Sequence, residues 1–160
     1  MRAHAESTNA PILVVEDEPG TRAQITRILR HAGYPVVAVG NGEEALECLR
    51  QDARPCLVVL DLMLPVMDGF EFRVRQMQDP EIANIPVVVV SGGVDFERKA
   101  ETLRPEACLS KPVNRAALLA AVGRRERRPA PRRPPGEARR APLPARVRSA
   151  ARDARGGLSR

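Results

Sequence analysis

The 160-residue sequence predicts an α/β fold, a three-layer sandwich in which helices cover both faces of a parallel sheet. Two observations support this prediction. Short runs of aliphatic, often β-branched residues recur along the chain, and each is followed by a segment whose apolar residues repeat at helical spacing. Strands that alternate with helices require right-handed crossover connections, which produce a parallel sheet. We therefore expect five βα units.

The expected strands are aliphatic runs at residues 12–15, 35–39, 57–60, 87–90 and 107–110. Helices are expected from Pro19 to Gly33, after a cap at Asn41, and over residues 70–78, 94–103 and 114–122. Apolar residues at helical spacing should face inward from these segments: Ile25, Ile28, Leu29, Ala32, Ala45, Leu46, Leu49, Leu118, Leu119 and Val122. Asn41 with Glu44, and Asp68 with Glu71, are typical of helix N-termini.

Charge divides the chain into two parts. Up to Gly123, 13 Lys and Arg stand against 17 Asp and Glu, whereas residues 124–160 hold 13 Arg and 3 acids. The first part is long enough to bury a core of its own. The second holds six of the 15 prolines and few large aliphatic residues, so it cannot offset its ordering entropy. We expect a flexible segment at 1–9, one domain at 10–124, and a disordered Arg/Pro/Ala-rich segment at 125–160, the basic tail.

The three cysteines, Cys48, Cys56 and Cys108, form no CxxC pair and have no histidine at metal-ligand spacing. We expect them to be small buried hydrophobic residues in a reducing compartment. The longest aliphatic run, residues 85–90, is far shorter than the roughly 18 residues that a membrane helix needs. The N-terminus also lacks the apolar region of a signal peptide. These features predict a cytoplasmic protein without a membrane span.

Chemically active side chains stand at the ends of four expected strands. Glu16 and Asp17 follow the first, Asp61 the third, Ser91 the fourth and Lys111 the fifth. Because the carboxyl ends of parallel strands meet at one edge of a sheet, these residues should lie together. Three carboxylates repel one another, and an all-oxygen ligand set suits Mg²⁺. Lys111 and Ser91 could bind phosphate oxygens, so the joint pattern predicts phosphoryl chemistry, although each residue alone would be unremarkable at a surface or turn.

The motifs ILVVEDEP, LDLMLPVMDG, VVVVSGG and LSKP resemble those of response regulator receiver domains of bacterial two-component systems. The resemblance covers about residues 10–124 and implies a stand-alone, chemotaxis-regulator-like receiver with a flavodoxin-like sheet of order 2-1-3-4-5. It implies the following roles: Asp61 as phospho-acceptor, Asp17 and Asp61 as direct ligands of Mg²⁺ or Mn²⁺, Glu16 as a ligand through water, Met63 as a backbone carbonyl ligand, Ser91 as the switch hydroxyl, and Lys111 as the phosphate-binding lysine.

The same resemblance implies a phosphoryl acceptor rather than an enzyme with an external substrate. The expected donor is a sensor histidine kinase or a phosphotransfer protein, and a downstream protein should bind the fourth helix, fifth strand and fifth helix. Two positions depart from the family pattern. Glu16 stands where aspartate is common, and Cys108 stands where a switching Tyr or Phe is usual. The second departure makes the usual readout questionable without affecting phosphorylation.

Three other functions compete with this interpretation. The stretch GNGEEA, residues 40–45, fits a dinucleotide-binding fingerprint, but Glu43 and Glu44 would repel a pyrophosphate at the helix start. A phosphatase with an aspartate nucleophile would need another acid two residues after Asp61, where Met63 stands. The third is a receiver fold that binds protein partners without being phosphorylated, which the cysteine at position 108 favours.

The basic tail leaves three alternatives open. Charge runs are most often solvated surface without a partner. The thirteen arginines of residues 124–160, a stretch without an aromatic residue, could instead bind polyanions through their phosphates or other anionic groups, without base stacking. The tail could also fold back on the acidic first part of the chain and compete for the acidic pocket.

Overall fold

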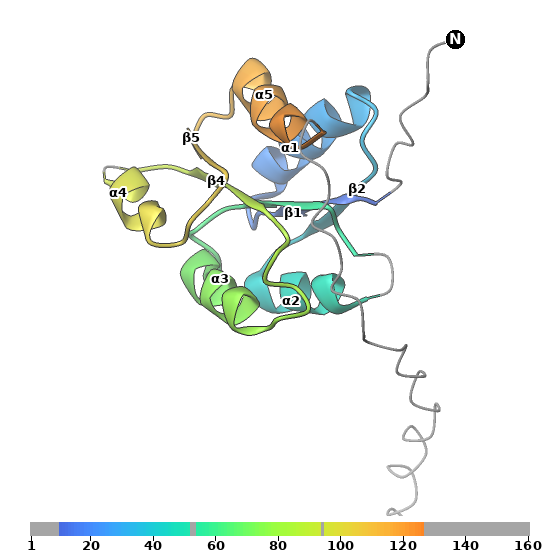
Figure 1. Ribbon diagram of the computed structural model, residues 1–160. Coiled ribbons are helices and arrows are strands. Elements are labelled where there is room, and N and C mark those ends of the chain that lie inside the picture. Colours follow the sequence, from blue (N-terminus) through green and yellow to red (C-terminus); the bar gives the residue numbers. More distant parts are fainter. Residues whose placement is uncertain (1–9, 52–53, 94, 127–160) are drawn as a thin grey trace, which may run out of the picture. The chain divides into compact units, whose positions relative to one another are not determined.

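The computed structural model describes residues 10–51, 54–93 and 95–126 (Figure 1). The expectations for the flexible N-terminus and for nearly all of the basic tail lie outside the described residues. Within them, no helix is both long enough and apolar enough to cross a membrane. The last helix reaches Glu126, and so includes two residues that composition alone places in the tail. Arginine and glutamate are good helix formers, so they extend a helix that is already nucleated.

The described residues form one parallel sheet of five strands in the order β2-β1-β3-β4-β5, which confirms the expected topology. The strands are β1 Ile12–Val15, β2 Val36–Val39, β3 Leu57–Leu60, β4 Val87–Ser91 and β5 Ala107–Ser110. β1, β3 and β4 occupy the centre and are buried along their whole length. Their continuous aliphatic sequences fit this position, since a parallel strand covered on both faces has no solvent side.

Five helices connect and cover the strands: α1 Pro19–His31, α2 Gly42–Arg50, α3 Gly69–Gln78, α4 Phe96–Glu101 and α5 Arg115–Glu126. α1 and α5 lie on one face of the sheet, and α2 and α3 lie on the other (Figure 1). The expected caps are present: the side chain of Asn41 accepts a hydrogen bond from the Glu44 N–H, and that of Asp68 accepts one from the Glu71 N–H. The three-layer α/β sandwich is therefore confirmed.

The core consists of two apolar clusters, one on each face of the sheet. Alternate strand residues enter different clusters: Leu13 and Val15 pack against α2 and α3, whereas Ile12 and Val14 pack against α1 and α5. This is the period of two that a pleated strand imposes. The strand ends are held between two packed layers, so the side chains that follow them start from fixed positions.

The structure corrects three details. α4 is shorter than the expected helix over 94–103, because Asp95 has left-handed backbone angles and Leu103 N–H already bonds three residues back, to Ala100. Ala32 is the exposed C-cap of α1 and does not face inward. The three cysteines are only half-buried, since each lies at the margin of a cluster and not at its centre.

Candidate functional site

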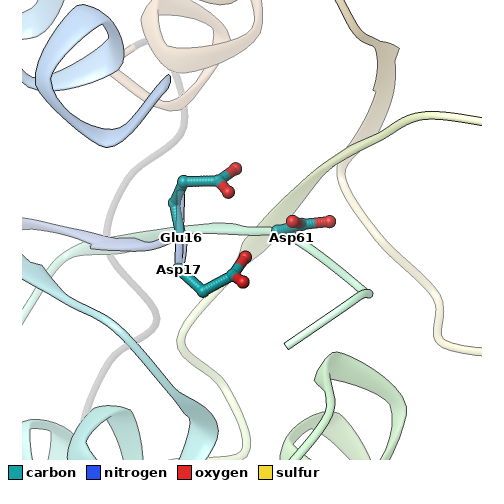
Figure 2. A group of neighbouring side chains, drawn as sticks. All are labelled: Glu16, Asp17 and Asp61. Atoms are coloured by element: carbon teal, nitrogen blue, oxygen red, sulfur yellow. The ribbon is translucent and has the colours of Figure 1, made fainter. Parts of the chain in front are cut away.

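Three carboxylates meet at the carboxyl edge of the sheet. Glu16 and Asp17 follow β1, Asp61 follows β3, and Figure 2 shows their side chains side by side. One oxygen from each lies within 4.8 Å of those of the other two. Glu16 is 1% exposed and Asp61 is 4% exposed, whereas Asp17 is open to solvent. The expected meeting of acids from two distant parts of the chain is therefore what the fold produces.

The loop from β1 to α1 is held by main-chain hydrogen bonds. Glu16 N–H donates to the Val39 carbonyl at 3.1 Å, and the Glu18 N–H donates to Glu16 Oε1 at 3.1 Å. Glu18 in turn caps α1, where its carboxylate accepts from the N–H groups of Thr21 and Gly20. These hydrogen bonds, of which that from Thr21 contributes most, lower the pKa of Glu18 to about 2. The Glu18 carboxylate therefore belongs to the helix terminus and not to the cluster.

The loop from β3 to α3 fixes Asp61 on two sides. Its N–H donates to the Val15 carbonyl at 3.0 Å, and its Oδ1 accepts from the Met63 N–H at 3.1 Å. Gly69 closes the loop by donating to the Leu62 carbonyl at 3.0 Å. Only glycine fits there, because a Cβ on Gly69 would stand 2.7 Å from Leu62 Cα. Asp61 consequently sits on a loop packed tightly against the first turn of α3.

Lys111 joins the acids from the end of β5. Its Nζ lies 2.7 Å from Glu16 Oε2 and 2.9 Å from Asp61 Oδ2. Both distances are in the range of charge-assisted contacts between an ammonium and a carboxylate. Lys111 thus bridges two carboxylates that would otherwise face each other buried and unneutralised.

Burial and the contacts between charged groups shift the pKa values of Glu16 and Lys111. Burial raises the pKa of Glu16, and the nearby Lys111 ammonium opposes that shift. Burial alone would lower the pKa of Lys111, but its contacts with Glu16 and Asp61 outweigh burial, and the pKa is raised. Lys111 is therefore a permanent cation at neutral pH.

Ser91 ends β4 at the same edge and is 1% exposed. Its carbonyl accepts from the Lys111 N–H at 3.0 Å, and it is aligned with Ser110 across the β4–β5 pair. Met63 lies beside Asp61 and is 73% exposed. The structure thus brings Glu16, Asp17, Asp61 and Lys111 into direct proximity, with Ser91 and Met63 adjacent through the backbone.

The donor set fits a hard divalent cation. All of the candidate side-chain ligands are carboxylates, which Mg²⁺ and Mn²⁺ prefer. Lys111 can neutralise only one of the three negative charges, and a divalent cation would balance the rest. The residues present therefore suit the ion that the motifs imply.

The fingerprint GNGEEA does not form a dinucleotide site. Gly42 N–H, at the start of α2, already donates to the Met67 carbonyl at 3.1 Å. Gly42 is buried, and a Cβ there would stand 2.7 Å from that same oxygen. The glycine serves the close packing of α2 against the loop that follows β3, so the place that a pyrophosphate would need is filled by protein.

Comparison with known proteins agrees with this geometry. Residues 12–123 match the model of the response regulator receiver domain, so the chain belongs to that family. It is 38% identical over 117 residues to Protein Rrf1 of Nitratidesulfovibrio vulgaris, covering 72% of this chain and 81% of that protein. Protein PilH of Pseudomonas aeruginosa is 30% identical over 115 residues, covering 71% of this chain and 94% of PilH.

Other relatives are longer. Nodulation protein W of Bradyrhizobium diazoefficiens is 34% identical over 122 residues. The matched region covers 74% of this chain and 52% of that protein. It therefore covers about half of that protein. Among solved structures, Vibrio cholerae CheY4 superposes with a TM-score of 0.65 at 30% identity, covering 72% of this chain and 98% of that one. The phosphorylated cyanobacterial phytochrome response regulator RcpA gives a TM-score of 0.62 at 30% identity, with coverage of 73% and 91%.

Proposed function

We propose that this receiver domain accepts a phosphoryl group on Asp61 in a two-component phosphorelay. The observation that carries the proposal is the contact of Lys111 with both Asp61 and Glu16 inside a cluster of three carboxylates. A structural cluster would need the lysine only for charge balance. The position of the lysine also puts a cation beside Asp61, which follows a central strand and is held on a tight loop. The similar protein RcpA has been solved in phosphorylated form.

The transfer needs little covalent chemistry from the protein. An Asp61 carboxylate oxygen attacks phosphorus, the new O–P bond forms, and the N–P bond of a phosphohistidine breaks with its electron pair left on the imidazole. Met63 N–H orients the carboxylate by donating to Oδ1. Lys111 leaves Oδ2 to bind a phosphoryl oxygen, and the Ser91 hydroxyl donates to another. Asp17 and Asp61, Glu16 through water, and the Met63 carbonyl would hold Mg²⁺ or Mn²⁺, which supplies charge neutralisation as two anions meet.

Response regulators interact with histidine kinases or phosphotransfer proteins and with downstream targets. For this chain we place the downstream surface on α4, β5 and α5, next to Ser91 and Lys111. The phosphoryl group adds about −1.5 to −2 charges and biases an existing equilibrium of these elements. Because Cys108 has neither the volume nor the ring of an aromatic residue, phosphorylation should change this conformational equilibrium less than it does in typical receivers. Amide chemical-shift changes confined to the surroundings of Asp61 would fit this proposal, and large changes along α5 would contradict it.

Intact mass spectrometry after incubation with acetyl phosphate and Mg²⁺ tests the acceptor. The natural chain should gain one phosphoryl group, and Asp61→Asn should gain none, because the amide keeps the shape of the side chain but not its nucleophilicity. Asp68→Asn is the matched control, since asparagine caps a helix as well as aspartate does. An undiminished adduct in Asp61→Asn would falsify the assignment.

A receiver fold that binds partners without phosphorylation is the alternative, and Cys108 is the observation that favours it. The mass experiment separates the two. A chain that gains no phosphoryl group at saturating Mg²⁺ and phosphodonor would leave the fold as a binding module only.

The arginines of residues 124–160 support a second proposal, that the basic tail binds polyanions such as DNA through their phosphates. If about six arginines engage phosphates, affinity should fall roughly a thousandfold between about 50 and 200 mM salt. A chain that ends after Glu126 keeps the whole of α5 and should lose this binding but still be phosphorylated. Equal DNA affinity with and without the tail would contradict the proposal, as would no binding at low salt.

A further inference from the structure

The carbonyls of the acid pair lie beyond the end of the sheet. The last sheet-type hydrogen bonds of this segment use the Val15 carbonyl, which accepts from Asp61 N–H, and the Glu16 N–H, which donates to Val39. The carbonyls of Glu16 and Asp17 follow directly. Since Glu16 is buried, its carbonyl needs a donor to avoid the cost of an unpaired polar group.

Arg22 supplies that donor from α1. Its side-chain nitrogen Nη1 donates to the Glu16 carbonyl at 2.9 Å and to the Asp17 carbonyl at 3.2 Å. The side chain is half-buried, and its own N–H donates to the Glu18 carbonyl at 2.9 Å in the first turn of α1. One guanidinium nitrogen thus holds two consecutive peptide groups from a helix whose start is itself capped.

Holding two consecutive carbonyls fixes the orientation of the peptide plane between Glu16 and Asp17. That plane decides the directions in which the two carboxylates leave the backbone, and hence whether their oxygens converge on Asp61. Arginine suits the task because it is charged at every accessible pH and its planar group is preorganised for hydrogen bonding. The hydrogen bonds of its guanidinium go to these backbone oxygens and not to the carboxylates of the cluster.

We propose that Arg22 is a positioning residue for the metal and phosphoryl site, acting through the backbone of Glu16 and Asp17. The proposal rests on the proposed function, because it assumes that the three carboxylates bind a divalent cation. Groups that orient metal ligands from behind typically contribute 10–100-fold to metal affinity.

The direction in which Mg²⁺ affinity changes when Arg22 is replaced separates a positioning role from a simple effect of its charge. Arg22 is a cation close to a cation site, so its loss through electrostatics alone would tighten Mg²⁺ binding. Loss of positioning would weaken it. Arg22→Met removes both the charge and the hydrogen bonds, whereas Arg22→Lys keeps the charge and can offer a donor to one carbonyl. Arg27→Met is the matched control, because it removes a charge from the exposed side of the same helix.

The test is calorimetric titration of each full-length variant with Mg²⁺ alone, with thermal unfolding in EDTA followed by circular dichroism to verify folding. Arg22→Met should bind Mg²⁺ 10–100-fold more weakly, Arg22→Lys should recover part of the affinity, and Arg27→Met should match the natural chain. Saturating Mg²⁺ should restore most of the phosphorylation rate of Arg22→Met, so the loss appears in the Mg²⁺ concentration needed and not in the maximal rate.

Unchanged or tighter Mg²⁺ binding by Arg22→Met would overturn the inference while leaving the proposed function intact. If Arg22→Met does not fold, Arg22→Lys decides alone, and an affinity equal to that of the natural chain overturns the inference. A natural chain that binds no Mg²⁺ overturns both the inference and the metal-dependent function, and this outcome is distinguished by the first titration.

Discussion

Gly69→Ala should disturb Asp61 from the far side of its loop. A Cβ at this position would meet the Asp61 carbonyl oxygen and stand 2.7 Å from Leu62 Cα, whereas carbon atoms pack at about 3.5–4.0 Å. The loop must therefore move by roughly 1 Å. Overpacking of this kind costs about 1–3 kcal/mol. The lower backbone entropy of alanine in the unfolded chain offsets about 0.4–1 kcal/mol, so a net loss of about 1–2 kcal/mol is expected.

The effect on phosphorylation should be larger than the effect on stability. A displacement of roughly 1 Å at a reacting group can cost about 100-fold in rate. Urea unfolding followed by far-ultraviolet circular dichroism measures the first effect, since the chain has no tryptophan for fluorescence. The time course of the phosphoryl adduct by mass spectrometry measures the second.

Gly123→Ala is the matched control for this substitution. Gly123 lies in α5, and a Cβ there meets nothing within 4 Å. Alanine should stabilise this helix by about 0.4–1 kcal/mol and leave phosphorylation unchanged. The reasoning fails if Gly69→Ala is as stable as Gly123→Ala, or if it is phosphorylated at the rate of the natural chain.

Three further predictions concern residues outside the acid cluster. Arg73 is 6% exposed and donates to two main-chain carbonyls and to Gln76 Oε1, so Arg73→Ala should cost about 3 kcal/mol in urea unfolding, because it leaves these buried acceptors without a donor; an unchanged urea midpoint would contradict this. Burial raises the pKa of the Cys108 thiol, so its alkylation by iodoacetamide at about pH 9 should be slower in the folded chain than in urea. Because the folded pKa lies above the unfolded one, the stability linked to this thiol is present below the unfolded pKa and is lost as pH rises through the folded pKa; equal alkylation rates would refute the shift. Asp68→Ala should lower the free energy of unfolding by about 1 kcal/mol through loss of the hydrogen bond from Glu71 N–H, and an unchanged urea midpoint would show that the cap contributes nothing.

Most of the fold follows from local sequence. Aliphatic runs buried on both faces have no other place in an α/β protein, so β1 and β3 occur where the pattern predicts them, and β4 continues one residue beyond its expected end, to Ser91. The expectation for α4 was less accurate. Its pattern continues beyond both ends of the helix, but Asp95 and Arg104 have positive φ angles that no periodicity reveals. Helix ends depend on single backbone conformations, which nearby tertiary contacts select.

Part of the candidate site also follows from local sequence, and part does not. The order of strands and the position of acids and lysine at strand ends determine that Glu16, Asp17, Asp61 and Lys111 share one edge, because parallel strands all point the same way. This much is a property of the sequence. Their shared edge does not require Lys111 to bridge two of the acids, and nothing in the local pattern assigns Arg22 a role.

The tertiary structure alone decided those contacts. The sequence suggests that Arg22 is an ordinary surface charge on α1. In the fold, its side chain reaches the carbonyls of Glu16 and Asp17, which lie beyond the end of the sheet. The sequence suggests that Arg73 and Gln76 are ordinary polar helix residues, yet both are buried. Arg73 donates to the Leu103 carbonyl far along the chain, and Gln76 donates to the Ile82 carbonyl in the segment that follows α3. Local pattern records how apolar residues repeat, whereas the partner of a long polar side chain depends on which backbone groups the packed layers leave without a hydrogen bond.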